Sequence, residues 1–314
     1  MTETLATYSL LGVYSAMAVY TIAFVLFTLD LARRSAVSAS KQDAALAGAE
    51  GGTALLTRPA VETASKGPRY LRAAMALTVL AWVIQVASTV LRGVAASRVP
   101  WANMFEFALT ATAIIVGVFL LVQFWQDLRY LGAFITGFAT IALGTATIVF
   151  YVDVVPLQPA LQSVWLVIHV FVATLGTGFF ALGAALSILQ LMRLRRDNGG
   201  LTRARFLDTI PAADRLENLA YRLNIVGFVF WTFTLIAGSI WAERAWGRYW
   251  GWDTKEVWTF IIWVLFAGYI HARATRGWRG SRSAWLAIIG FAAVIFNFTI
   301  VNMFFKGLHA YSGL

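Results

Sequence analysis

Residues 223–242 read LNIVGFVFWTFTLIAGSIWA, a run of twenty residues without a charged side chain. A helix of this length rises about 30 Å, which matches the hydrocarbon thickness of a bilayer. Helical backbone satisfies its own N–H and C=O groups, as it must where no water is available. This run therefore predicts a membrane-spanning helix.

The same kind of run recurs along the whole chain. Hydrophobic residues make up 60% of the sequence and charged residues 13%, with a mean hydropathy of +0.72. A soluble globule of this composition would keep an apolar exterior, so the bilayer is the expected solvent. We expect an all-α, polytopic membrane helix bundle, with residues 1–314 forming a single integral membrane domain. The eight expected transmembrane helices lie at about 8–32, 70–92, 103–125, 131–151, 162–192, 223–242, 257–273 and 284–305.

The connection after residues 223–242 is unusually aromatic. Between the sixth and seventh runs the chain reads Trp246-Gly-Arg-Tyr-Trp250-Gly-Trp252-Asp253-Thr-Lys-Glu256-Val-Trp258. Indoles provide rigid stacking faces and favour the boundary between hydrocarbon and water. The Trp-rich segment, residues 243–256, therefore predicts a binding surface for a large, flat, partly polar ligand, and haem has these proportions.

Lys and Arg are distributed unevenly over the connections. If the first helix runs from outside to inside, the Arg-rich connections, such as residues 193–222, face the cytoplasm. The basic residues then left outside are Arg92, Arg98, Arg244, Arg248, Lys255 and Lys306. The positive-inside rule therefore predicts that both termini and the Trp-rich segment are extracytoplasmic.

Two cytoplasmic connections have distinct compositions. Residues 35–68 are rich in Ala, Ser, Gly and Thr, which predicts a flexible cytoplasmic loop. Apolar positions at 216, 219, 220 and 223 fit a short amphipathic helix at the interface. Within the fifth run, Gly176, Gly178 and Gly183 are expected to allow close approach to a neighbouring helix.

Charge and cysteine content exclude several function classes. The net charge is +10, but the positive residues gather at cytoplasmic helix ends, where anionic membrane lipid balances them. Nucleic acid is therefore not an expected partner. The chain has no cysteine, which excludes disulfides, thiolate metal sites and a cysteine nucleophile. Any thiol chemistry must come from a partner.

The chain has three histidines, His169, His271 and His309. The topology places His169 and His309 on the side of the Trp-rich segment, where two neutral imidazoles could fill both axial positions of a haem iron. His271 lies near the cytoplasmic end of the seventh helix, and an ionisable group at membrane depth is a functional candidate. Each histidine also fits an interfacial or capping role, and the sequence leaves both interpretations open.

The charged residues of the Trp-rich segment have structural alternatives too. Asp253 and Glu256 match a capping box at the start of the seventh helix. Arg244, Arg248 and Lys255 could pair with haem propionates or with lipid phosphates, and the sequence does not separate these. Asn103 and Glu106 fit the first turn of the third helix, whose start is a candidate wall of the same cavity.

These motifs resemble the CcsA/ResC-type subunit of the system II cytochrome c synthetase, called CcsB in some bacteria, within the haem-handling group that carries a Trp-Trp-Asp motif. The resemblance spans most of residues 69–314. It is carried by Pro100, Asn103 and Glu106; residues 161–165 through His169; Tyr221-Arg222; Gly227-Phe228; Trp246 through Asp253 and Glu256; His271; and Gly307-Leu-His309. One departure is Val229, where we associate a proline with the family.

The resemblance implies specific roles. It assigns His169 and His309 as haem ligands, and His271 as a ligand to haem in transit, with the second ligand from a ResB-type partner subunit. It gives the presentation of haem b to a CxxCH segment of apocytochrome c to Trp246, Trp250, Trp252, Asp253, Glu256 and Trp258. The implied activity is that of a haem lyase subunit in the plasma (inner) membrane, or in the thylakoid membrane for a plastid-type source. Beyond haem positioning, no catalytic acid or base is demanded.

Two other functions remain open. A haem-delivery or export protein would pass haem to a separate chaperone without forming the thioether bonds. An unrelated membrane transporter would use the tryptophans as an interfacial belt, and it would need charged residues along a mid-membrane pathway. The expected helix centres contain almost none.

Overall fold

The computed structural model describes residues 2–50, 69–154, 162–275, 277–305 and 307–309. The regular elements in these ranges are all helical, and eight helices are long and apolar enough to cross a membrane. The predicted all-α bundle of eight helices is thereby confirmed. These are α1 (Thr2–Glu50), α2 (Arg69–Ala96), α3 (Met104–Val122), α4 (Gly132–Val149), α5 (Val164–Asp197), α6 (Ala213–Trp246), α7 (Thr254–Thr275) and α8 (Ser281–Phe296). Shorter elements are η1 (Arg129–Leu131), η3 (Arg205–Thr209), the π-helix η4 (Asn297–Val301) and α9 (Asn302–Phe304).

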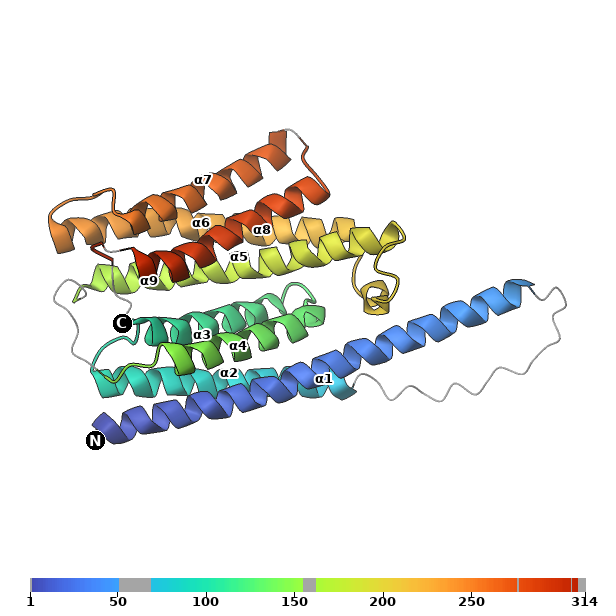
Figure 1. Cartoon of the computed structure of the whole chain (residues 1–314), viewed down its shortest axis with the longest axis horizontal. Helices are drawn as coiled ribbons and strands as arrows, with labels where there is room; N and C mark the ends of the chain where they lie inside the picture. Colours follow the sequence, from blue (N-terminus) through green and yellow to red (C-terminus); the bar gives the residue numbers. More distant parts are fainter. Residues whose placement is uncertain (1, 51–68, 155–161, 276, 306, 310–314) are drawn as a thin grey trace.

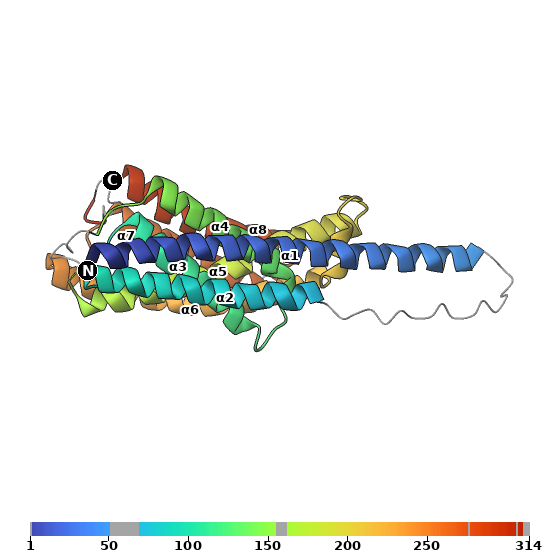
Figure 2. The ribbon, with the colours of Figure 1, turned by 90° about the horizontal axis from the view of Figure 1, so that it is seen from below.

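The helices pack in two groups, α1–α4 and α5–α8, which meet where α3 lies against α5 (Figure 1). One apolar core runs through α1–α6, and a second is shared by α5–α8. The start of α1, the α6–α7 connection and α9 lie at one end of the bundle, here called the Trp-rich end (Figures 1 and 2). The opposite end, with the α5–α6 connection, is called the Arg-rich end. Which end faces the cytoplasm stays a prediction.

The first helix is longer than its sequence predicted. Residues 35–68 were expected to form a loop, but α1 continues to Glu50 and projects beyond the other helices at the Arg-rich end (Figure 2). The segment after residue 34 is rich in Ala, a strong helix former, and contains no Pro or Gly before Gly48. Continuing a helix is easier than nucleating one, so the helix persists. The rest of the predicted loop, residues 51–68, lies outside the described residues.

Small residues bring α5 and α6 together along their length. A Cβ added to Gly176 would lie 3.3 Å from the carbonyl oxygen of Gly227, and one added to Gly183 would lie 2.1 Å from Oδ1 of Asn224. The predicted close approach of the fifth helix is confirmed at both levels. This contact matters for the site, because α5 and α6 each contribute residues to it.

The Arg-rich end is closed by a buried carboxylate. Glu217 Oε2 accepts hydrogen bonds from Gln190 Nε2 (3.2 Å) and from the Gly280 N–H (2.9 Å), and Arg273 Nη1 donates to the Glu217 carbonyl (2.9 Å). Four helices are joined there. Leu216 beside it is buried in the first turn of a continuous α6, so the separate amphipathic helix predicted here is wrong.

Candidate functional site

His169 lies near the start of α5, at the Trp-rich end. Its Nδ1 is 3.0 Å from the backbone carbonyl oxygen of Thr234 on α6. A carbonyl only accepts, so Nδ1 must carry the hydrogen and the neutral ring leaves its lone pair on Nε2. A Cβ added to Gly238 would lie 2.8 Å from both Cε1 and Nδ1 of His169. Gly238 therefore leaves the space in which the imidazole reaches the carbonyl.

His309 follows α9 and is held by a carboxylate in place of a carbonyl. Its Nδ1 lies 2.6 Å from Oδ2 of Asp253, which directly precedes α7. A Cβ added to Gly307 would lie 2.0 Å from Oδ1 of Asp253, so only glycine permits this approach. The hydrogen bond with His309 lowers the pKa of Asp253 below its usual 3.8. The carboxylate therefore stays ionised, and in the neutral tautomer that it favours Nδ1 carries the hydrogen and Nε2 is the acceptor.

Half of the predicted capping box is present. Oε2 of Glu256 accepts hydrogen bonds from the backbone N–H groups of Gly251 (2.7 Å) and Asp253 (3.1 Å). These bonds hold the end of the Trp-rich segment against the first turn of α7. The Asp253 carboxylate is turned toward His309, so it serves the histidine as well as the helix start.

One indole connects the two histidines. Trp241 of α6 is 1% exposed, and its ring centroid lies 6.0 Å from that of His169 and 5.4 Å from that of His309. Trp246 completes the cluster at 4.7 Å from Trp241 and 4.9 Å from His309. The two histidines predicted as a pair thus lie at the same end of the bundle, and both pack against the Trp241 indole.

The remaining tryptophans, two in the Trp-rich segment and Trp258 just after it, have different surroundings. Trp250 lines the smaller cavity described below and packs edge-on against Trp252 at 6.0 Å. Trp252 is 77% exposed and adopts a φ of 60°, a strained value for a bulky residue. Trp258 lies 4.3 Å from Phe296 and packs between α7 and α8. Trp258 therefore supports the helix packing, and it is not among the residues lining either cavity.

Two adjoining cavities reach both histidines. The larger, of about 240 Å³, extends from His169 and His309 between α3, α5 and α8 as far as Phe138 of α4, with a mainly apolar lining. The smaller, of about 70 Å³, lies among α5, α6 and α7 and is lined by both histidines and Trp250. Apolar walls with a few polar groups are usual features of a ligand-binding cavity.

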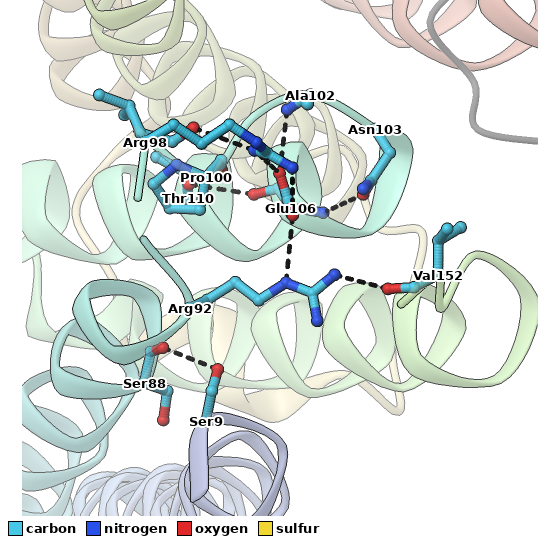
Figure 3. A network of polar contacts seen from close by, with 11 residues as sticks. Ser9, Ser88, Arg92, Arg98, Pro100, Ala102, Asn103, Glu106, Thr110 and Val152 are labelled. Atoms are coloured by element: carbon cyan, nitrogen blue, oxygen red, sulfur yellow. Dashed lines mark hydrogen bonds and ion pairs between the residues drawn. The ribbon is translucent and has the colours of Figure 1, made fainter. Parts of the chain in front are cut away.

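The start of α3 forms one wall of the larger cavity, and a buried ion cluster holds it in place (Figure 3). Glu106 is fully buried and pairs with Arg92 (3.1 Å) and Arg98 (2.6 Å). The Arg92 guanidinium also donates to the Val152 carbonyl (2.5 Å), and Asn103 caps α3 by accepting from the Glu106 N–H (2.9 Å). The start of α3, predicted as a normal helix start and a candidate cavity wall, has both roles.

The three basic residues proposed as anion partners separate in the structure. Lys255 lines both cavities, and its Nζ donates to Oδ1 of Asn302. The Arg244 guanidinium lies 5.9 Å from the Trp165 ring centroid. The Arg248 side chain covers Gly251, where a Cβ would collide with it. Neither arginine lines either of the two cavities that reach the histidines.

His271 stands apart from the site. It lies in the last turns of α7, 17 residues after Thr254, so helix rise places it about 26 Å from the Trp-rich end. Its side chain is exposed, and within the described chain no hydrogen bond, ion pair or ring contact reaches its imidazole. The structure brings His169 and His309 together and leaves His271 on the surface of the other end.

Several site residues escaped the sequence interpretation. Thr234, Gly238 and Trp241 lie at spacings of four and three on one face of α6, and all three serve the histidines. That spacing was a usable signal, but Thr234 contributes only its backbone. The Asn302 partner of Lys255 carried no signal, because it depends on how α9 returns to α7.

Comparison with known proteins places this arrangement in a family. Residues 70–309 match the family described as Cytochrome C assembly protein. The chain is 35% identical over 253 residues to the cytochrome c biogenesis protein CcsA of Heterosigma akashiwo, covering 68% of this chain and 77% of that relative. It is 33% identical over 252 residues to the CcsA of Trieres chinensis, covering 71% and 81%.

A solved structure shares the fold. The cytochrome c haem lyase CcmF aligns with a TM-score of 0.65 over 94% of this chain. The alignment covers 46% of that lyase, and the sequences are 17% identical. At that identity the likeness establishes the fold alone.

Proposed function

Because this chain belongs to the cytochrome c assembly protein family and is of the CcsA type, we propose that it is the haem-presenting subunit of a cytochrome c synthetase. In this proposal it holds haem b between His169 and His309 and presents it to a CxxCH segment of apocytochrome c. The haem is the substrate, and two thioether bonds are the product.

The observation that carries the proposal is the matched environment of the two histidines. Each donates Nδ1–H to a fixed acceptor, the Thr234 carbonyl or the Asp253 carboxylate, and each keeps Nε2 for a metal. Metal-ligating histidines almost always have such a partner, which sets the tautomer and the ring orientation. A surface histidine that only forms hydrogen bonds needs no such partner. Two histidines with fixed Nδ1 partners on the same cavity therefore support their assignment as an axial pair.

The contribution of this chain to the reaction is positioning. Each cysteine thiol of the substrate adds across a vinyl group, so sulfur bonds one vinyl carbon and the thiol proton ends on the other. Holding the macrocycle in place replaces a bimolecular encounter with an oriented one, which is worth several kcal/mol. The apolar cavity wall and the Trp241–Trp246 pair exclude water around the ring. The histidine of CxxCH then replaces one imidazole as the product leaves.

His271 supports a role that needs another protein. An exposed imidazole near the Arg-rich end offers one axial ligand, and a ResB-type partner subunit would supply the second. In the proposed topology, the Trp-rich end faces the outside of a bacterial plasma membrane and the Arg-rich end faces the cytoplasm. In a thylakoid membrane, the two ends would face the equivalent compartments. Haem would then enter near His271 and be used near His169.

Haem spectra of the purified protein, alone and with its partner, test the proposal. We expect the wild type to show a low-spin bis-histidine Soret spectrum. Both His169→Ala and His309→Ala should lose this spectrum, and both should lose cytochrome c maturation in cells. Added imidazole should restore part of both. Normal maturation in both variants would contradict the ligand assignment. Normal haem binding with a haem chaperone as partner would favour haem delivery over bond formation.

A further inference from the structure

Lys255 lies near the charge of the Asp253 carboxylate but is not paired with it. It is the second residue of α7, where the positive end of the helix dipole disfavours a cation. Its Nζ donates to a neutral group, Oδ1 of Asn302. The two carboxylates beside it in sequence are engaged elsewhere: Asp253 holds His309, and Glu256 accepts two backbone N–H groups. Among the described residues, Lys255 forms no salt bridge.

A second donor, the side-chain amide of Asn103, lines the same cavity. Asn103 is 4% exposed, and its Oδ1 caps α3, while its Nδ2 has no hydrogen-bond partner among the described residues. Asn302 connects the two donors, since its Nδ2 lies 3.4 Å from Sδ of Met104, the residue after Asn103. An unmatched buried donor costs about 1–3 kcal/mol, so its presence here calls for an acceptor.

Both donors lie on the cavity that holds the two histidines. His169, His309, Asn103 and Lys255 all line it, whereas Arg244 and Arg248 do not. A cation and an amide N–H₂ together suit a carboxylate, which accepts from both. The cavity is otherwise mainly apolar, so the carboxylate must belong to a molecule with a large apolar body.

We propose that Lys255 and Asn103 form a propionate-binding site that fixes the in-plane orientation of the porphyrin held by His169 and His309. This proposal rests on the proposed function and names the orienting contact within that same site. The propionates and the vinyl groups occupy opposite edges of the macrocycle. Fixing the propionate edge therefore decides which edge the incoming thiols meet.

The test compares iron protoporphyrin IX with its propionate dimethyl ester, which keeps the iron and the apolar ring. Affinities are measured by Soret titration of the whole chain in detergent. We expect the wild type to prefer the free acid by about 10- to 100-fold, as charge-assisted hydrogen bonds imply. In Lys255→Met the preference should fall to within about threefold, with the affinity for the ester and its bis-histidine spectrum unchanged.

Two further variants sharpen the test. Asn103→Asp keeps the acceptor that caps α3 and replaces the free donor with an anion, so it should also abolish the preference for the free acid. Arg244→Gln, away from the cavity, is the matched control and should keep it. A Lys255→Met protein that still prefers the free acid, with a normal spectrum, would overturn the proposal.

Two other outcomes bear on the source of the anion and on the wider function. If vesicles containing phosphatidylglycerol compete with the ester in the wild type and not in Lys255→Met, a lipid phosphate occupies the site and the propionate assignment is wrong. If the wild type binds the ester through both histidines without preferring the free acid, this inference is wrong and the proposed function stands. If the wild type has no histidine-dependent spectrum, both this inference and the proposed function are wrong.

Discussion

The two ends of the bundle hold histidines of different character. At the Trp-rich end, His169 and His309 each have a fixed Nδ1 partner, share the Trp241 indole and line one cavity. At the Arg-rich end, His271 is exposed and has no side-chain partner in the described chain. The difference shows that this chain contains one preorganised pair of imidazoles and, apart from it, one exposed imidazole, which we propose is half of a second site.

Removing either member of the pair should have the largest effect. His169→Ala or His309→Ala is expected to weaken haem binding by more than about 100-fold, since even changing a residue that only hydrogen-bonds a metal ligand costs about 10- to 100-fold. The measurement is a Soret titration of purified protein, with thermal unfolding as the control for folding. Imidazole should recover part of the low-spin band, and a band unaffected by both substitutions would contradict the pairing.

Removing the carboxylate behind His309 should have a smaller effect. Asp253→Asn is expected to lower haem affinity by about 10- to 100-fold, because the amide orients the ring less strongly and no longer favours Nδ1–H. The matched control is Asp208→Asn at the Arg-rich end, where the pKa of Asp208 is lowered chiefly by Arg196 and no effect on haem is expected.

The sign of the Asp253 effect also predicts its pH dependence. Its pKa is lowered in the folded chain, so the contribution of the ionised carboxylate to folding is complete above the usual value of 3.8 and is lost as the pH falls through the lower folded value. The difference in thermal stability between wild type and Asp253→Asn should therefore be constant from neutral to mildly acidic pH. A difference that disappears near pH 6 would show that Asp253 is not held in this way.

Crowding His169 without touching it should have a moderate effect. In Gly238→Ala the new Cβ would lie 2.8 Å from the imidazole and displace it from the Thr234 carbonyl. We expect about a tenfold loss of haem affinity with helix stability retained, because Ala is the better helix former. Gly268→Ala on α7 has nothing within 4 Å and serves as the control. Equal affinities in the two variants would remove Gly238 from the site.

The smallest effect is expected at the other end. His271→Ala should leave the haem spectrum of the isolated chain unchanged, because His271 lies far from the pair. With a ResB-type subunit present, the same variant should lose a separate haem population, measured as haem per complex. A change in the isolated chain would show that the histidines share one site.

Much of the fold could be predicted because the bilayer imposes it. Apolar runs long enough to cross hydrocarbon identified the eight membrane-length helices of the described residues, and Gly176 and Gly183 indicated a close helix contact. The extension of α1 was missed because a polar, Ala-rich segment was taken for a loop although nothing in it ends a helix before Gly48. Local composition did not indicate that Leu216 belongs to a continuous α6.

The site was predictable in its side chains and less so in its supports. His169, His309 and Asp253 stood out by residue type, and the structure brings them together. Trp241 was missed because it lies within an apolar run, where a tryptophan is an ordinary membrane-helix residue. The sequence also could not show that Lys255, and neither Arg244 nor Arg248, lines the cavity. Both depend on pairing between helices, which no local pattern encodes.

The partners of the two histidines differ in how mutation can reach them. His309 depends on a carboxylate, which any substitution at position 253 alters. His169 depends on a peptide carbonyl, which every amino acid at position 234 still provides. A screen that varies side chains one at a time will therefore detect the Asp253 support of His309. It will miss the Thr234 support of His169, except through substitutions at position 238. A tolerant position 234 therefore does not show that Thr234 has no role, and Gly238 is the position at which substitution would disturb this contact.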